Sequence, residues 1–213
     1  MTTLIMVRHG ESEANRQNRF AGHADFDLTD IGRKQAEITG AYIAENFQVD
    51  AVYASDLQRA FKTGLTYAQM TGKTLVPKPG MREIFAGEWE GVPFDELKQK
   101  HPVEFGRWCN DIGRAGCMGG ETTKELSERI LRTLTEIAQA HDGQTVAIFT
   151  HGTPLRVMQA ICQLGNVEEA NRIPWASNAS VSVLEYENGQ FSFKVVGYDA
   201  HLKELRTVLP PDV

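Results

Sequence analysis

A short apolar run that stops abruptly sets the strongest limit on what this chain can fold into. The residues from Leu4 to Val7 are followed at once by Arg8, His9 and Gly10. An unbroken run of this length is typical of a strand buried on both faces, as in a parallel sheet. A guanidinium and an imidazole at its end, with a glycine that lets backbone approach a ligand, indicate an anion site. A surface turn that contains these residues by chance is the alternative for this motif taken alone.

The same arrangement occurs a second time, late in the chain. Residues 145–150 form an apolar segment that is followed by His151 and Gly152. Thr153 then suits a helix N-cap, and Pro154 suits the first helical position. The pattern predicts a second buried strand that delivers a histidine to the start of a helix.

A third strand, over residues 51–54, is predicted to end at a Ser or Asp cap, with a helix over 56–70 that carries Arg59 in its first turn. The carboxyl ends of parallel strands lie along one edge of a sheet. We therefore expect one crevice to receive four cationic or imidazole side chains: Arg8, His9, Arg59 and His151.

The motifs in order are Arg8-His9-Gly10-Glu11-Ser12 with Asn15, Ser55 with Arg59-Ala60, Glu83, and His151-Gly152. This series resembles the histidine phosphatase superfamily, which contains cofactor-dependent phosphoglycerate mutases and related phosphatases. The resemblance covers nearly the whole chain. It implies an α/β fold, a three-layer α/β/α sandwich with a mostly parallel central sheet, and a phosphohistidine intermediate.

The resemblance also implies a role for each matched residue. The implied catalytic residues are His9, Glu83, Arg8, Arg59 and His151, and the implied substrate-binding residues are Asn15, Gly22 and Gly152. His9 is the expected nucleophile and Glu83 the expected general acid and base. An isolated glutamate would otherwise be assigned to a solvated surface, so Glu83 rests on its place in the motif order. No metal and no cofactor are expected, because arginines supply the positive charge.

Phosphatases and mutases of this superfamily share the site and differ in what binds beside it. Residues 84–91, which follow Glu83, contain no Lys or Arg, and an apolar and acidic wall binds a second anion poorly. The sequence therefore favours a phosphatase acting on small phosphorylated metabolites. A phosphoglycerate mutase and a catalytically weak phospho-ligand binding module are the alternatives.

The chain is expected to form a single domain over residues 1–213, with a helical cap inserted at about 87–121. Amphipathic helices are predicted over 94–111 and 122–140. Residues 119–122 either contribute to the pocket rim or only begin a helix. Two segments around Asn188-Gly189, residues 181–186 and 191–196, predict a β-hairpin at an antiparallel edge of the sheet.

Two loops carry further expectations. Residues 20–29 resemble the family segment Gly-x-x-Asp-x-Pro-Leu-Thr, but Asp27 replaces the proline, which predicts a looser loop. His23 is expected either near the pocket or in solvent, and Thr29 is the predicted N-cap of a helix over 30–47. Residues 81–91 are predicted to be a functional loop rather than a core element, with Glu90 in solvent.

Composition narrows the range of partners. The 213 residues carry a formal net charge of −6, which argues against nucleic acid or an anionic membrane surface as a partner. The first residues run directly into a strand without a signal peptide, so a cytoplasmic location is expected. A homodimer is compatible with the sequence. Cys109, Cys117 and His101 do not match the spacing of a zinc site.

Overall fold

The computed structural model describes residues 1–207, and it contains one sheet of six strands in the order β3-β2-β4-β1-β5-β6. β1 pairs in parallel with β4, and β2 pairs in parallel with both β4 and β3. β5 and β6 complete the sheet in antiparallel orientation. The strands are β1 (Thr2–Arg8), β2 (Ala51–Ala54), β3 (Leu75–Pro77), β4 (Thr145–Thr150), β5 (Val181–Glu187) and β6 (Gln190–Tyr198).

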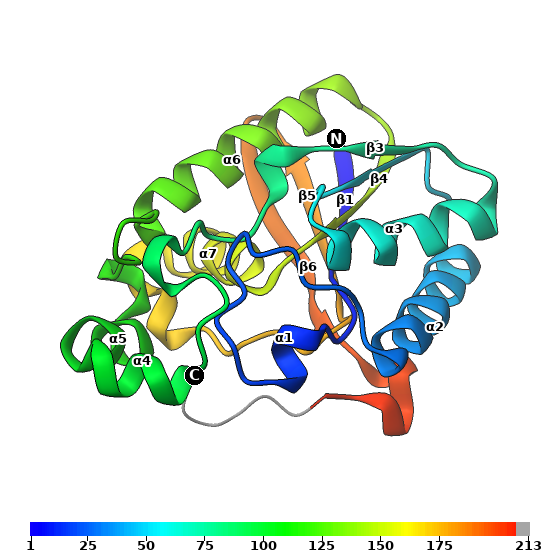
Figure 1. The fold of residues 1–213 in the computed structure, drawn as a ribbon. Helices are drawn as coiled ribbons and strands as arrows, with labels where there is room; N and C mark the ends of the chain where they lie inside the picture. The colour runs from blue at the N-terminus through cyan, green and yellow to red at the C-terminus, as the bar shows by residue number, and fades with distance from the viewer. Residues whose placement is uncertain (208–213) are drawn as a thin grey trace.

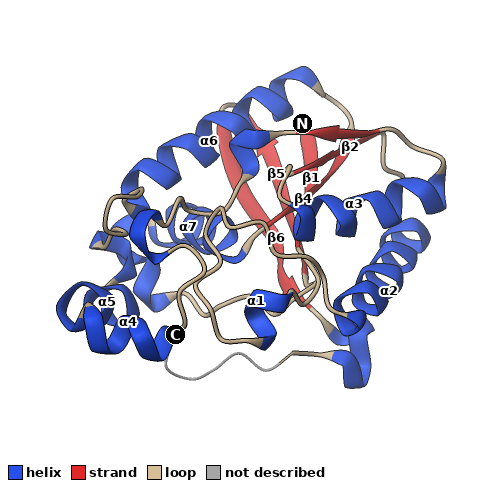
Figure 2. Ribbon diagram, viewed as in Figure 1, coloured by secondary structure: helices blue, strands red, loops and turns tan. Residues whose placement is uncertain are grey.

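Helices cover both faces of this sheet (Figures 1 and 2). The α-helices are α1 (Glu13–Arg16), α2 (Asp30–Asn46), α3 (Gln58–Thr71), α4 (Phe94–Lys100), α5 (Pro102–Asn110), α6 (Thr123–Ala140) and α7 (Gly152–Leu164). α2 and α3 lie against one face, and α6 and α7 lie against the other (Figure 1). The predicted three-layer α/β/α sandwich with a mostly parallel sheet is confirmed.

The middle residues of the two central strands are apolar because each strand faces a hydrophobic core on both sides. Successive side chains of a strand point to opposite faces of the sheet. In one core lie Leu4, Met6, Val146 and Ile148, and in the other lie Ile5, Val7, Ala147 and Phe149. The unbroken apolar runs in the sequence follow directly from this double burial.

The starts of two crossover helices differ from the prediction. α7 has His151, not Thr153, at its N-cap, so Pro154 is the third helical residue. Proline is tolerated there because the first four N–H groups of a helix have no intrahelical partner. α3 begins at Gln58, and its N-cap is Leu57 without a side-chain cap. The predicted Ser or Asp cap is therefore wrong.

The segment predicted as one helix over 94–111 is two helices, α4 and α5, separated at His101. The residue before a proline is disfavoured in the helical conformation, and Pro102 follows His101. Pro102 then occupies the first turn of α5, where it needs no hydrogen-bond donor. The predicted helix over 122–140 is α6, with Thr122 as its N-cap.

Residues 81–91 were predicted to stand outside the core, and this is wrong. Met81, Ile84, Ala86 and Trp89 are fully buried, and two 3-10 turns interrupt the loop. Trp89 lies edge-on to Phe20 at 5.5 Å between ring centroids. The sequence did not predict this burial, because the apolar residues have no regular period and are separated by glycine and charged residues.

The aromatic cluster around Trp89 joins the first loop of the chain to residues 87–121. Trp89 also packs edge-on against Phe105, and Phe20 packs against Trp108 at 5.0 Å. These aromatic side chains belong to the same hydrophobic core that covers one face of the sheet. That this segment is a cap on a single domain stays a prediction. The predicted domain spans residues 1–213, and its last six residues lie outside the described range.

The C-terminal hairpin is confirmed. β5 and β6 pair around Asn188 and Gly189, both of which have positive φ angles of 51° and 81°. This is the left-handed backbone that the tightest hairpin turns require. None of the helices within residues 1–207 has the length and apolar character needed to cross a bilayer.

Replacement of Trp89 tests the core beneath the cap. Its ring is fully buried, and its Nε1 makes no hydrogen bond within residues 1–207. We expect Trp89→Ala to lower the free energy of unfolding by about 3–5 kcal/mol, the range for deleting a buried aromatic ring. Trp89→Phe should cost less, because it keeps edge-to-face packing and loses no hydrogen bond. Urea titrations of both variants measure this, and equal losses would show that ring packing is not the source.

Candidate active site

A cavity of about 180 Å³ opens at the carboxyl edge of the central strands. Its lining includes Arg8 and His9 from the end of β1 and Arg59 from the first turn of α3. His151, at the end of β4, lies beside His9 but does not line the cavity. Of the other candidate residues, Asn15, Gly22, Glu83 and Gly152 also line it. The structure therefore gathers the candidates, while their chemical roles stay predictions.

His9 is buried with one ring nitrogen fixed and the other available. Its Nδ1 lies 2.7 Å from the carbonyl oxygen of Gly10, which can only accept a hydrogen bond, so Nδ1 carries the proton. Nε2 then holds the lone pair and has no hydrogen-bond partner within the described chain. Burial, and then the charges of Arg59 and Arg8, hold the pKa of His9 well below its usual value. The imidazole is neutral at pH 7, as a nucleophile must be.

Gly10 serves a different purpose from the one predicted. A Cβ at Gly10 would lie 2.3 Å from the carbonyl oxygen of Gly32, in the first turn of α2. Glycine is therefore needed for close packing of the strand end against a helix, not for the approach of a ligand. Gly10 also does not line the cavity.

Arg8 and Arg59 are buried guanidiniums held by backbone carbonyls. Arg8 donates to the carbonyl of Ala176, and Arg59 donates to the carbonyls of Gly22 and Ala24 at 2.7 and 3.0 Å. Within residues 1–207, neither forms an ion pair with a carboxylate within 4 Å. Burial lowers the pKa of each to about 10, against the opposing charge of Glu83, so both stay charged at neutral pH.

The Nε atoms of both arginines are buried without a hydrogen-bond partner in the described chain. Buried donors of this kind are costly unless a ligand satisfies them. Guanidinium groups are suited to oxyanions, because their planar donors can bond two oxygens at once. The pair is therefore chemically suited to bind a phosphate-like anion beside His9.

His151 lies fully buried beside His9, with the two ring centroids 5.2 Å apart. Its Nε2 is 2.8 Å from the hydroxyl of Ser55, and this hydroxyl already accepts the N–H of Leu57. We assign the hydroxyl proton to a bond with Nε2, which places the ring proton of His151 on Nδ1. That atom is buried without a hydrogen-bond partner among residues 1–207. Burial holds the pKa of His151 well below its usual value, so it too is neutral.

The carboxylate of Glu83 contacts the N-terminus of α7. Oε1 of Glu83 accepts the N–H of Ile84 at 2.9 Å, and Oε2 accepts the N–H of Thr153 at 3.3 Å. The positive end of a helix dipole favours negative charge, here from the carboxylate and from an anion near Gly152. Gly152 borders the cavity as the first residue of that helix.

Asn15 is oriented by a residue that the sequence did not indicate. Oδ1 of Asn15 accepts the N–H of Ser12 at 3.0 Å and a bond from Nδ2 of Asn178 at 3.2 Å. Because these bonds occupy Oδ1, the amide nitrogen Nδ2 of Asn15 points to the opposite side, where it can donate a hydrogen bond. Asn178 also binds the carbonyl of His9 and lines the cavity. It lies 163 residues from Asn15, and no local pattern marks it.

Glu90 is not a solvated residue, contrary to the prediction. Its carboxylate accepts the N–H groups of His23 and Ala86 at 2.8 Å, and that of Ala24. This holds the loop whose carbonyls bind Arg59. Gly22 in this loop has φ +50°, and a Cβ there would lie 2.5 Å from Glu90. Glycine is required at this position.

Asp27 does not loosen the loop, so that expectation is also wrong. Its carboxylate pairs with Lys62 at 2.6 Å and Arg33 at 3.4 Å, and it accepts the N–H of Leu28. Two helices thereby anchor the loop where a proline would have stiffened it. His23 is bound to the site's frame rather than free in solvent, with Nε2 2.9 Å from the carbonyl oxygen of Glu83.

Away from Arg8, Arg59 and His9, the cavity wall is mostly apolar. It includes Phe20, Ile84, Phe94, Trp108 and Trp175, two of which belong to the predicted cap. One more cation, Arg19, lines it and donates to the carbonyl of Gly91 at 2.8 Å. Residues 119–122 do not line it, so the predicted contribution to the pocket rim is wrong, while the predicted helix start is observed at Thr122. No group of three or more His, Cys, Asp or Glu residues in the described range is placed to hold a metal ion.

Comparison with known proteins gives a consistent result. The family described as "Histidine phosphatase superfamily (branch 1)" matches residues 4–199. Phosphoserine phosphatase 1 of Hydrogenobacter thermophilus is 31% identical, over 96% of this chain and 96% of that protein. A metal-independent phosphoserine phosphatase of Arabidopsis thaliana is 31% identical, over 86% of this chain and 76% of its own. The solved structure of Bacillus stearothermophilus YhfR has a TM-score of 0.90 at 30% identity and covers 95% of this chain and all of its own.

The two neutral histidines make stability depend on pH in a defined window. Because their folded pKa values lie below the unfolded value of about 6.5, the unfolded state binds more protons as pH falls. The stability they contribute is complete above about pH 6.5 and is lost toward their folded pKa values. In this window, the contribution of each histidine to the free energy of unfolding falls by up to about 1.4 kcal/mol per pH unit.

We expect a double variant, His9→Asn with His151→Gln, to lose less stability than the native protein between pH 7 and 5. Asn and Gln keep a polar group at the bonded nitrogen of each ring without its titration. Urea unfolding at half-unit pH steps measures the two slopes. Parallel slopes would contradict the assignment of two neutral, buried histidines.

Proposed function

This chain belongs to the histidine phosphatase superfamily, and on that premise we propose that it hydrolyses small phosphomonoesters through a phosphohistidine on His9. The observation that carries the proposal is the environment of His9. Within residues 1–207 its Nε2 lone pair is free, its ring is neutral, and two buried arginines that form no ion pair lie beside it. A nucleophile and an anion-binding cradle thus share one cavity.

In the first step, His9 attacks phosphorus in line with the leaving oxygen. A phosphomonoester carries about −1.5 to −2 charges at pH 7, and a neutral imidazole approaches it without repulsion. Arg8 and Arg59 bind the equatorial oxygens and stabilise the charge that develops there. The Nδ1 proton of His151, the N–H of Gly152 and the amide of Asn15 are further donors to these oxygens.

Glu83 serves both steps. It protonates the departing alkoxide, and it then takes a proton from the water that cleaves the phosphohistidine. Its carboxylate is fixed by two backbone N–H groups and lines the cavity, so it can reach both the leaving oxygen and the water that replaces it. The net reaction converts a phosphomonoester and water into an alcohol and phosphate.

The cavity wall supports hydrolysis over mutase chemistry. A mutase has to retain a second anionic group of its substrate for rephosphorylation. Here the segment after Glu83 adds no cation to the wall, and its neighbours Phe94 and Trp108 are apolar. Arg19 is the one further cation in the described lining, and the carbonyl of Gly91 holds part of its guanidinium. A mutase and a non-catalytic phospho-ligand binding module are the competing functions.

Small substrates suit the cavity. Its volume of about 180 Å³ is near the roughly 150 Å³ that accommodates benzene. We propose phosphoserine, the substrate class named for two relatives, as the first compound to test, with phosphoethanolamine as the match that lacks a carboxylate. A difference between the two would report whether Arg19 contributes to selection. The cytoplasmic location and the homodimer stay predictions.

The covalent step predicts that phosphate is found on His9 and nowhere else. We expect rapid acid-free quenching followed by mass spectrometry to show this adduct during turnover, and His9→Asn to abolish both adduct and activity. Activity should survive a strong chelator, because arginines provide the positive charge. Phosphate on another residue, or complete loss of activity with chelator, would overturn the scheme. Turnover only with a bisphosphate present would instead indicate a mutase.

The acid role predicts a selective defect in Glu83→Gln. An alkoxide needs a proton as it leaves, whereas nitrophenolate is stable as an anion. We expect hydrolysis of alkyl phosphates to fall about 10²–10⁴-fold, while the first step with nitrophenyl phosphate suffers far less. Dephosphorylation still needs the base, so stopped-flow absorbance should show a burst of nitrophenolate and then slow turnover. If the burst slows as much as alkyl phosphate hydrolysis does, the acid is a different residue.

A further inference from the structure

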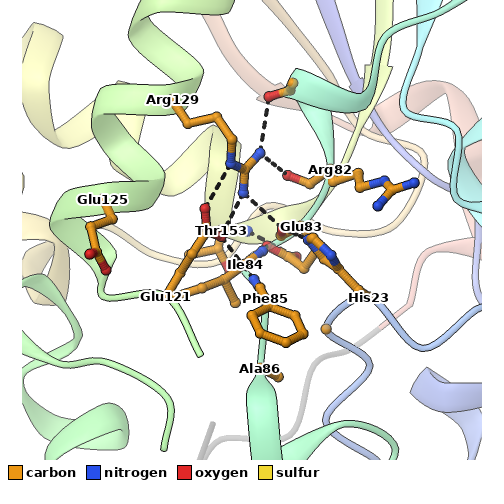
Figure 3. A network of polar contacts seen from close by, with 12 residues as sticks. His23, Arg82, Glu83, Ile84, Phe85, Ala86, Glu121, Glu125, Arg129 and Thr153 are labelled. Carbon is orange, nitrogen blue, oxygen red and sulfur yellow. Dashed lines mark hydrogen bonds and ion pairs between the residues drawn. The ribbon is translucent and has the colours of Figure 1, made fainter. Parts of the chain in front are cut away.

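Arg129, on α6, connects that helix to the loop that carries Glu83 (Figure 3). Its guanidinium uses all five of its N–H groups. Nη1 donates to the carbonyls of Gly80 and Arg82, each at 3.0 Å, and Nη2 donates to the carbonyl of Glu83 at 3.0 Å. The remaining two go to the carboxylate of Glu121, from Nε at 2.8 Å and Nη2 at 2.7 Å.

Glu121 continues this network to the other side of Glu83. Its Oε2 also accepts the N–H of Phe85 at 2.9 Å, and its own N–H donates to the carbonyl of Phe85 at 2.8 Å. The side chains of Arg129 and Glu121 are only 17% and 21% exposed, so solvent screens the pair weakly. The backbone on both sides of Glu83 is therefore tied to a single ion pair.

The carboxylate of Glu83 is outside this network. Arg129 binds the main chain of Glu83, and the carboxylate instead accepts N–H groups of Ile84 and Thr153. The loop needs such support because it follows a 3-10 turn and its carbonyls have no partners from a regular ladder. It also lies close to α6, since a Cβ at Gly80 would be 2.3 Å from the hydroxyl of Thr133.

We propose that Arg129, supported by Glu121, is a positioning residue for the general acid and base Glu83. It holds the backbone from Gly80 to Phe85 so that the carboxylate faces the leaving oxygen without being neutralised by the cation that places it. The proposal rests on the function proposed above, because it concerns the same proton transfer. Small displacements of a catalytic group are costly to the chemical step.

The variant Arg129→Lys tests this assignment. Lysine keeps the positive charge beside Glu121 but has three N–H donors instead of five and no planar fork. The carbonyls on either side of Glu83 lose part of their support, while the ion pair remains. We expect kcat/KM to fall at least tenfold for an alkyl phosphate and by less than threefold for the first step with nitrophenyl phosphate.

A double-mutant cycle separates positioning from a general loss of folding. In the Glu83→Gln background, Arg129→Lys should reduce alkyl phosphate hydrolysis by less than twofold, because the acid it positions is already absent. Arg114→Lys is the control, with the same substitution at a more exposed arginine whose side chain is 52% exposed. It removes another arginine that binds a carboxylate, Glu168, at 2.8 Å, but it makes no contact with the loop. It should leave both substrates within twofold of the native values.

The outcomes are distinct. Equal slowing of both substrates by Arg129→Lys, or additive effects in the cycle, would overturn the positioning role and leave Arg129 as a structural residue. If the native enzyme forms no phosphohistidine on His9, the proposed function itself fails, and this is measured before any Arg129 variant is made. Selective loss for the alkyl phosphate together with non-additivity would support the proposal.

Discussion

Two buried guanidiniums that form no ion pair with a carboxylate of the described chain are the feature on which the rest of this structure depends. Burying a charge is costly unless it is hydrogen-bonded. Arg8 and Arg59 meet that requirement with backbone carbonyls, and within residues 1–207 their Nε atoms stay without a partner and can bind an incoming phosphate. The carbonyls must be held in turn, and Glu90 does this for the loop that contains Gly22. A loop that looks irregular in sequence is thus part of the anion site.

Burial, with a smaller contribution from the same two charges, lowers the pKa of both histidines. Burial and the neighbouring arginines keep His9 and His151 neutral, so one can act as a nucleophile and the other as a hydrogen-bond donor. Arg129 also donates to backbone carbonyls, those of Gly80 and Glu83. There the guanidinium fixes the backbone, and the charge is absorbed by Glu121. Arg8 and Arg59 thus act through their positive charge, whereas Arg129 acts through its hydrogen-bond donors.

Several local expectations failed where a distant segment decided the outcome. Gly10 meets the first turn of α2 rather than a ligand, and Asp27 is anchored by Lys62 from α3. Ser55 was expected as a candidate cap, yet its hydroxyl lies against His151 across the sheet edge. Each of these partners is more than 20 residues away in sequence, so neither propensity nor spacing could reveal it.

By itself the sequence determined the strands, the crossover helices and the order of the motifs. Apolar runs of four to six residues mark buried parallel strands, and that topology forces Arg8 and His9 to one edge with His151. Tertiary structure alone decided which atoms are free to react. Whether Nε2 of His9 keeps its lone pair depends on the carbonyl that Nδ1 contacts. The orientation of the Glu83 carboxylate depends on the N–H groups of Ile84 and Thr153. Hydrogen-bond geometry between distant segments is a property of the packed chain, and residue type does not encode it locally.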